Sequence, residues 1–182
     1  MDVKPVGRLD KATEGLLLFT ALAPKISDSQ SGLLYEGHDY SGIGEVSDYV
    51  ILMTYEWGYQ FGPPLAVAPI RNVEQVVNYA VSVIDKDKIL LGIPNYAYDW
   101  PLPYVKGETE AKGISNVDAL NTAIENGAAI IFDDDAKTPY FNYMTDGVEH
   151  VVWFENARSI EAKLDLVEKY GIRQAPTLVV VK

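Results

Sequence analysis

Cysteine is absent from this chain of 182 residues, and histidine occurs only at His38 and His150. Without cysteine the chain can form no disulfide, no thiol nucleophile and no thiolate metal site. Two histidines are too few for a zinc site built mainly on imidazole. We therefore expect no metal and no cofactor. His38 is predicted in a loop and His150 in a strand, with no recognisable catalytic partners in the sequence.

Positive charge and long apolar runs are also scarce. Lysine and arginine number 15 against 26 aspartates and glutamates, which gives a net charge of −11 and a pI near 4.5. Such an acidic chain lacks the positive surface that sequence-independent nucleic-acid binding requires. No run reaches membrane-spanning length, and the first residues contain no apolar signal core. These features predict no membrane partner and, for the chain as it stands, a cytoplasmic location.

The remaining composition, 48% hydrophobic and 23% charged, is that of a globular protein in which short apolar runs alternate with helical patterns. The helical patterns have apolar residues spaced three and four apart. Asn72 and Asn156 are the predicted N-caps, at which these helices begin. The runs predict strands at 16–23, 48–55, 88–94 and 175–182, and the patterns predict helices at 72–84 and 156–170.

This alternation predicts an α/β fold with a four-stranded parallel sheet. Residues 100–154 interrupt it, with a predicted helix at 116–125, an apolar stretch at 128–132 and a strand at 149–154, and are interpreted as an α+β insertion. Four βα units correspond to half of a (β/α)8 TIM-type barrel, which needs about eight to close. Open sheet edges and an apolar face then predict self-association, as a homodimer or larger homo-oligomer.

Three segments stand out in the chain: GLLYEGHDYSGIGEVSDYVILMTYEWGY, KILLGIPNYAYDWPLPYVKG and EHVVWFENARSIEAKLDLVEKYGI. They resemble the second half of family 18 glycoside hydrolases, in the spore-cortex and peptidoglycan-directed branch of that family. The resemblance runs from about residue 20 to 172. It implies that the four predicted strands are barrel strands five to eight, that the partner is an amino-sugar oligosaccharide, and that natural relatives are spore-associated or secreted.

The acidic motif D-x-x-D-x-D-x-E, on which the family's chemistry depends, does not occur in these 182 residues. In the family its last glutamate protonates the glycosidic oxygen, and the acetamido group of the substrate acts as nucleophile. The cluster Asp133–Asp134–Asp135 has the wrong spacing and falls in the insertion. The missing motif predicts a chain that is catalytically inactive.

The two ends resemble other families. VGRLDKATEGLLLFT, at 6–20, is similar to a signature of small-subunit-type pseudouridine synthases, in which Asp10 would be the nucleophile. YGIRQAPTLVVVK, at 170–182, is similar to a thioredoxin-like strand, although no C-x-x-C accompanies it. It places Thr177, Leu178 and Val179 where the glycosidases have a sugar-stacking tryptophan.

These resemblances predict a chimeric or engineered chain made of three parts. Residues 1–19 would be a foreign segment that supplies part of the first strand. Residues 20–99 and 155–182 would form the half-barrel, and residues 100–154 the insertion.

The candidate site residues follow the predicted second and third strands. The resemblance gives Tyr55 and Glu56 a role in holding the sugar, although a rim pair without a ligand would look the same. Aromatic side chains gather just beyond, and they either stack on sugar rings or pack against the rest of the protein. The predicted substrate-binding residues are Tyr55, Glu56, Trp57, Tyr96, Tyr98 and Trp100, with Tyr59 as a further aromatic neighbour.

Three functions stay open on this reading. The first is an inactive, self-associating half-barrel derived from a family 18 glycosidase. The second is an active glycoside hydrolase for N-acetylglucosamine-containing glycans such as chitin or peptidoglycan, which needs a replacement acid, with Glu56 the first candidate. The third is a module that binds such glycans without cutting them.

Overall fold

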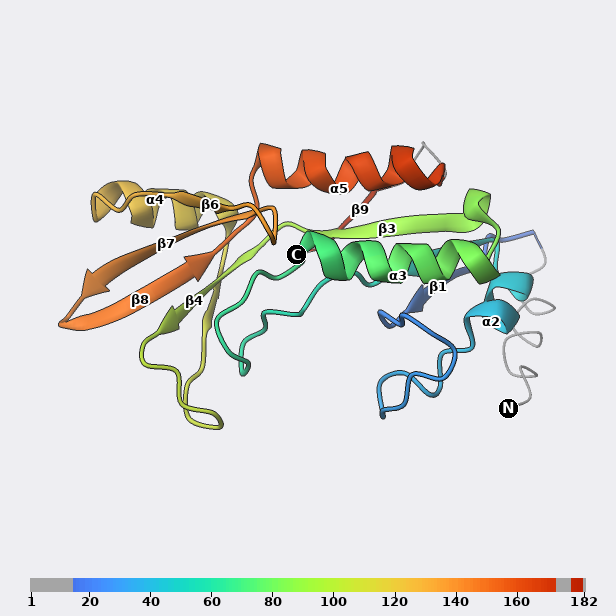
Figure 1. Ribbon diagram of the computed structural model, residues 1–182, viewed down its shortest axis with the longest axis horizontal. Helices are drawn as coiled ribbons and strands as arrows, with labels where there is room; N and C mark the ends of the chain where they lie inside the picture. Colours follow the sequence, from blue (N-terminus) through green and yellow to red (C-terminus); the bar gives the residue numbers. More distant parts are fainter. Residues whose placement is uncertain (1–14, 173–177, 182) are drawn as a thin grey trace. The chain divides into compact units, whose positions relative to one another are not determined.

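The computed structural model describes residues 15–172 and 178–181 and divides the chain into two compact units (Figure 1). Unit 1 comprises residues 1–54, 73–92 and 164–179, and unit 2 comprises residues 55–72, 93–163 and 180–182. Asp10 and Thr177 lie outside the described residues, as do the side chains of Leu178 and Val179. The roles expected of these residues therefore stay predictions.

Unit 1 contains a parallel sheet. Its elements, some of which continue into unit 2, are β1 (Phe19–Leu22), α2 (Tyr40–Val46), β2 (Tyr49–Leu52), α3 (Ile70–Val83), the 3₁₀ turn η1 (Lys86–Lys88), β3 (Ile89–Pro94), α5 (Ala157–Tyr170) and β9 (Leu178–Val181). The sheet order is β1-β2-β3-β9, and β1 pairs in parallel with β2, and β2 with β3. The α/β class is thereby confirmed.

Continuous burial explains why β3 was visible in the sequence. All six residues of β3 are buried, as expected for a parallel strand covered on both faces. The third predicted strand therefore agrees closely, whereas the first two are shorter in the structure than predicted. In α3 the buried residues Val73, Val76, Val77 and Ala80 follow the helical period.

The helix ends bear out one predicted cap and correct the other. The α3 helix begins at Ile70, so Asn72 lies in its first turn and is not its N-cap. In contrast, the Asn156 side chain accepts a hydrogen bond of 3.0 Å from the backbone N–H of Ser159 at the start of α5. The backbone N–H of Asn156 accordingly bonds the Ser159 hydroxyl, at 2.8 Å.

Unit 2 is built on an antiparallel sheet in the order β5-β4-β8-β7-β6. Its elements are β4 (Ala97–Pro101), β5 (Lys112–Ile114), α4 (Asn116–Glu125), β6 (Ile131–Asp133), β7 (Thr138–Thr145) and β8 (Val148–Trp153). The predicted helix at 116–125 is confirmed, and the predicted strand at 149–154 corresponds to β8. The strands β4, β5 and β7 were not predicted.

Two small cores lie on the two faces of this sheet. On one face Ala119 and Ala123 of α4 pack with Phe141, Val152 and other apolar side chains. On the other face the buried Trp100 packs with Ala111 and Val151. The sheet therefore holds a helix on one side and an aromatic cluster on the other, and both contribute to the site described next.

Candidate functional site

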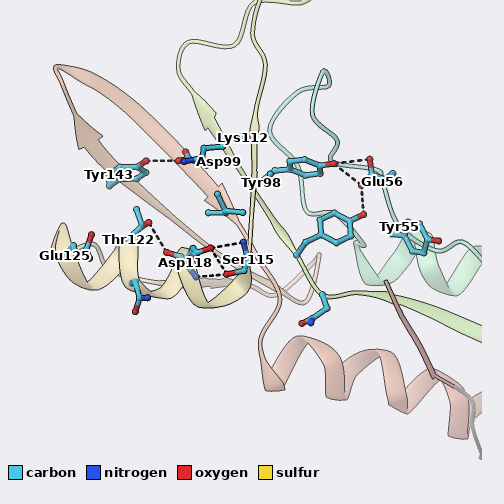
Figure 2. A pocket seen from close by; sticks show the side chains of 15 residues that line it. Tyr55, Glu56, Tyr98, Asp99, Lys112, Ser115, Asp118, Thr122, Glu125 and Tyr143 are labelled. Atoms are coloured by element: carbon cyan, nitrogen blue, oxygen red, sulfur yellow. Dashed lines mark hydrogen bonds between the residues drawn. The ribbon is translucent and has the colours of Figure 1, made fainter. Parts of the chain in front are cut away.

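A cavity of about 950 Å³ lies entirely within unit 2 and is lined by side chains from four segments (Figure 2). One segment follows β2, one runs from the end of β3 into β4, one runs from β5 through α4, and one is β7. We call this cavity the groove. Its lining residues are Tyr55, Glu56, Asn95, Tyr96, Tyr98, Asp99, Lys112, Gly113, Ile114, Ser115, Asp118, Asn121, Thr122, Glu125 and Tyr143.

Glu56 is held by two tyrosines at one end of the groove. Its carboxylate accepts a short hydrogen bond from the Tyr96 hydroxyl and bonds of 3.2 and 3.3 Å from the Tyr98 hydroxyl, which Figure 2 shows. The backbone of Glu56 has a φ of +69°, in the left-handed region that costs a non-glycine residue about 1–3 kcal/mol. Backbone strain of this kind clusters at functional sites, which makes Glu56 a candidate functional residue.

The tyrosines around Glu56 stay protonated over the neutral pH range. Burial, followed by the neighbouring Glu56 carboxylate, raises the pKa of Tyr98 to about 12 and that of Tyr96 further. The pKa of Tyr55 is raised by the same two causes in the same order. These phenols are therefore hydrogen-bond donors, and their rings offer flat apolar surface beside a carboxylate.

Helix α4 forms the opposite wall. It begins at a capping box, in which the Ser115 hydroxyl accepts from the backbone N–H of Asp118 at 3.0 Å and the Asp118 carboxylate accepts from the backbone N–H of Ser115 at 3.4 Å. The Ser115 hydroxyl also donates to the Asp118 carboxylate, at 2.7 Å. Because Ala119 and Ala123 face the sheet, the helical period turns Asp118, Thr122 and Glu125 toward the groove.

A third cluster joins Asp99 of β4 to Tyr143 of β7 and His150 of β8. The Tyr143 hydroxyl donates to one carboxylate oxygen of Asp99 at 2.7 Å, and His150 Nδ1 lies 2.8 Å from the other. Since a carboxylate only accepts, Nδ1 must carry the proton. Burial, and then Asp99, raises the pKa of Tyr143 well above its ordinary value.

Sequence reasoning missed this cluster because its members come from three strands, two of them unpredicted. The available signal was alternation: Tyr98 and Trp100 face one side of β4, so Asp99 must face the other. With β7 recognised, Tyr143 opposite His150 would have followed from the register.

The predicted binding residues divide between groove and core. Tyr55, Glu56, Tyr96 and Tyr98 line the groove together. Trp57 is half-buried and lies outside the lining.

Two other predicted aromatics also lie away from the groove lining. Trp100 is fully buried, where its indole N–H donates to the Gly62 carbonyl at 2.9 Å, so its ring offers no face to a sugar. Tyr59 is an exposed loop residue beside Gly62.

The other predicted polar positions have local partners. The Asp133 carboxylate accepts from the backbone N–H groups of Asp135 and Ala136 in the β6–β7 turn, while Asp134 pairs with Lys137. Over residues 15–172 and 178–181, no group of three or more histidines and carboxylates is arranged to hold a metal ion. No helix in that same part of the chain is long and apolar enough to cross a membrane.

Comparison with known proteins identifies the family. The sequence model for glycosyl hydrolases family 18 matches residues 6–173. The chain belongs to this family. The match includes the segment at 6–20 that resembles a pseudouridine synthase, and it stops short of the thioredoxin-like strand. Neither of those two resemblances, nor a chimeric origin, is supported by the comparisons.

Two of the similar relatives are proteins of Bacillus subtilis. A cortical fragment-lytic enzyme of Bacillus subtilis is 48% identical over 161 residues, which cover 88% of this chain and 37% of the relative. The putative sporulation-specific glycosylase YdhD of Bacillus subtilis is 36% identical over 160 residues, 87% of this chain and 37% of the relative. These similarities support the predicted spore-cortex branch of the family.

Solved structures agree with the sequence relatives. The spore cortex-lytic enzyme SleL of Bacillus cereus matches with a TM-score of 0.93 and 39% identity, and covers 99% of this chain and 41% of that one. SleL of Bacillus megaterium QM B1551 matches with a TM-score of 0.91 and 42% identity over the same shares. The fold is therefore of the α/β TIM-like kind, and the chain spans about two fifths of the length of these relatives.

Proposed function

We propose that this chain is the glycan-binding part of a family 18 glycoside hydrolase, and that it holds amino-sugar polymers such as peptidoglycan or chitin in the groove. In this proposal β1, β2, β3 and β9 are the four strands of half a (β/α)8 barrel. Membership of the family and the similarity to cortex-lytic enzymes favour a hydrolase over a self-associating scaffold.

The observation that carries the proposal is the arrangement around Glu56. A strained backbone and two phenol donors fix its carboxylate at the end of the groove, between flat aromatic rings. A carboxylate accepts hydrogen bonds from sugar hydroxyl and acetamido N–H groups, while tyrosine rings cover the apolar faces of a pyranose. Both features suit an N-acetylated sugar.

The same geometry bears on the role of Glu56. Two donated hydrogen bonds suit a carboxylate that accepts, whereas a general acid must carry a proton to the leaving oxygen. We therefore assign Glu56 a role in binding. The family's proton-donor motif is absent from these 182 residues, so we expect this chain alone to bind the glycan and leave it intact.

The test is a titration of the chain with an N-acetylglucosamine tetramer, followed by tryptophan fluorescence, with mass spectrometry of the ligand afterwards. We expect saturable binding and uncut ligand. Glu56→Gln removes the charge but keeps the shape, and should weaken binding about tenfold or more, because hydrogen bonds to charged groups contribute about 1.5–3 kcal/mol.

The matched control is Tyr59→Phe, which removes the hydroxyl of a tyrosine that belongs to unit 2 but does not line the groove. It should bind like the unmodified chain. Absence of binding, or equal affinity of the Glu56→Gln variant, would refute the proposed site. Cleavage by the unmodified chain that is lost in Glu56→Gln would instead make Glu56 the catalytic acid.

A further inference from the structure

The hydroxyl of Tyr143 has a single proton to donate, and Asp99 takes it. Tyr143 lines the groove from β7, and its hydroxyl donates to the Asp99 carboxylate of β4 at 2.7 Å (Figure 2). A phenol has one O–H donor, and the lone pairs of its oxygen accept. With its proton directed at Asp99, Tyr143 meets a ligand in the groove as a hydrogen-bond acceptor.

The direction of this hydrogen bond is fixed by the surroundings of Asp99. His150 Nδ1 lies 2.8 Å from the second carboxylate oxygen and 3.5 Å from the Tyr143 oxygen, so its main bond goes to Asp99. The Asp99 side chain is only 11% exposed. If the carboxylate turned away from Tyr143 or His150, a largely buried polar group would lose its partner. Asp99 therefore holds the Tyr143 hydroxyl in one orientation.

The two tyrosines beside Glu56 repeat this arrangement at another wall of the groove. The hydroxyls of Tyr96 and Tyr98 donate to the Glu56 carboxylate, so their oxygens also keep lone pairs for a ligand. A hydroxyl that donates to an anion becomes a stronger acceptor, because hydrogen bonds in a chain polarise one another. The phenols of both walls thus favour ligand groups that donate.

From this geometry we propose that Tyr143 is a specificity-determining residue of the groove, an inference that rests on the proposed function. Its oxygen accepts a hydrogen bond from a hydroxyl or amide N–H group of the glycan. Asp99 is a positioning residue, which acts through Tyr143 by directing the phenol proton away from the ligand. A ligand oxygen that only accepts, such as an ether or carbonyl oxygen, finds no donor at Tyr143. The groove therefore favours the orientation of the glycan that places a donor there.

The experiment changes the electron density on the Tyr143 oxygen and leaves the shape of the ring nearly the same. In Tyr143→3-fluorotyrosine, made in the full chain, the fluorine withdraws electrons from the phenol oxygen. The O–H group becomes a stronger donor and the oxygen a weaker acceptor. Calorimetry with an N-acetylglucosamine tetramer, at slightly acid pH where the fluorinated phenol stays protonated, then gives opposite results for a tyrosine that accepts from the ligand and one that donates to it.

We expect the 3-fluorotyrosine variant to bind the tetramer about twofold more weakly than the unmodified chain. Tyr143→Phe, which removes the oxygen, should bind about two- to tenfold more weakly, the range that one hydrogen bond contributes. The matched control is Tyr59→3-fluorotyrosine, the same change in an exposed tyrosine outside the groove lining. It should bind like the unmodified chain.

The positioning role of Asp99 is tested by combining two substitutions. Asp99→Asn should weaken binding about two- to tenfold in the chain that contains Tyr143, and should have little further effect in the Tyr143→Phe chain. This dependence on Tyr143 is a result that a general loss of stability would not give. Equal losses in both chains would refute the positioning role.

The outcomes separate this inference from the proposed function. If the tetramer does not bind the unmodified chain, the proposed function fails, and this inference fails with it. If the tetramer binds but Tyr143→Phe has the same affinity as the unmodified chain, the inference is refuted and the proposed function stands. Tighter binding by the Tyr143→3-fluorotyrosine variant would show that Tyr143 donates to the ligand, and unchanged binding would show that its oxygen makes no bond to it. Either result would overturn the inference.

Discussion

Asp99 shows how one residue can organise a wall of the groove. Its two carboxylate oxygens accept from different donors, Tyr143 and His150, which belong to neighbouring strands. The side chain is largely buried, so its partners cannot be replaced freely by water. The orientation of the Tyr143 ring in the groove therefore depends on a residue of another strand.

Asp99→Asn should lower the free energy of unfolding by about 1–3 kcal/mol. The asparagine oxygen can still accept from one partner, but its NH₂ group then faces the other partner, which is also a hydrogen-bond donor. Tyr143→Phe should cost less, about 1 kcal/mol, since Asp99 keeps His150. Urea denaturation of both variants measures the difference. A loss in Tyr143→Phe equal to or greater than that in Asp99→Asn would contradict the shared-acceptor arrangement.

The buried pair Glu155–Lys163 is the other residue-scale feature with a measurable consequence. Lys163 Nζ lies 2.8 Å from the Glu155 carboxylate, and both side chains are almost wholly buried. Burial raises the pKa of Glu155, and Lys163 and Ser159 oppose that rise. With its folded-state pKa raised, Glu155 contributes stability that is present below its unfolded pKa and lost as the pH rises through the folded value.

Lys163→Met removes the main opposing cause, so the pKa of Glu155 should rise further. The variant should lose about 3–5 kcal/mol at pH 7, where an unpaired carboxylate is buried, and less near pH 5, where Glu155 can bind a proton. Denaturation at the two pH values provides the measurement. An equal loss at both would show that the carboxylate is not the cause.

At the scale of elements, the sequence predicted what apolar runs and helical periods can reveal. The buried strand β3 and helices α4 and α5 were recognised because burial on both faces, or on one stripe, leaves a clear pattern. In β4 and β7 tyrosine, tryptophan and polar residues alternate, and these strands were taken for loops or site segments. Their pairing with β8 is a tertiary relation that no local pattern contains.

The same limit applied to the candidate site. Tyr55, Glu56, Tyr96 and Tyr98 were predicted because they directly follow buried strands. The α4 wall and Asp99 were not, because they reach the groove through the antiparallel sheet.

The loop after Glu56 contains a glycine that the close approach of two backbone segments requires. A Cβ on Gly58 would lie 1.9 Å from the Leu65 carbonyl oxygen, and the Gly58 N–H donates to the Ala66 carbonyl at 3.0 Å. Gly58→Ala should lower the stability by about 1–3 kcal/mol or more. Thermal unfolding tests this, with Gly37→Ala as the control because a Cβ there meets open space. Equal melting temperatures would contradict the close approach.

At the scale of the whole molecule, self-association stays a prediction that the fold makes specific. In the sheet order of unit 1, β1 stands at one end, and Phe19 in this strand is half exposed, beside the exposed Leu16 and Leu17. An end strand with apolar side chains is a template for pairing with a second chain. In the half-barrel interpretation, a second copy of the chain is the predicted cover for this strand.

Sedimentation equilibrium should therefore give a mass above the 20.1 kDa of one chain, rising with concentration. Phe19→Lys places a charge on the end strand, as natural edge strands do, and should shift the mass toward a single chain. A mass of one chain at every concentration would refute self-association.

The order of strands in unit 2 also has a kinetic consequence. The strands β6, β7 and β8 are consecutive and joined by short turns. In contrast, β4 is far from β8 in the sequence, and their pairing places Tyr98 opposite Trp153. Nearby segments meet sooner than distant ones, so the three-stranded meander should form first during refolding. The walls of the groove that β4 and α4 provide would then be added last. In pulse-labelling by hydrogen exchange, amides of β7 should gain protection before those of β4, which makes the groove the final part of its unit to appear.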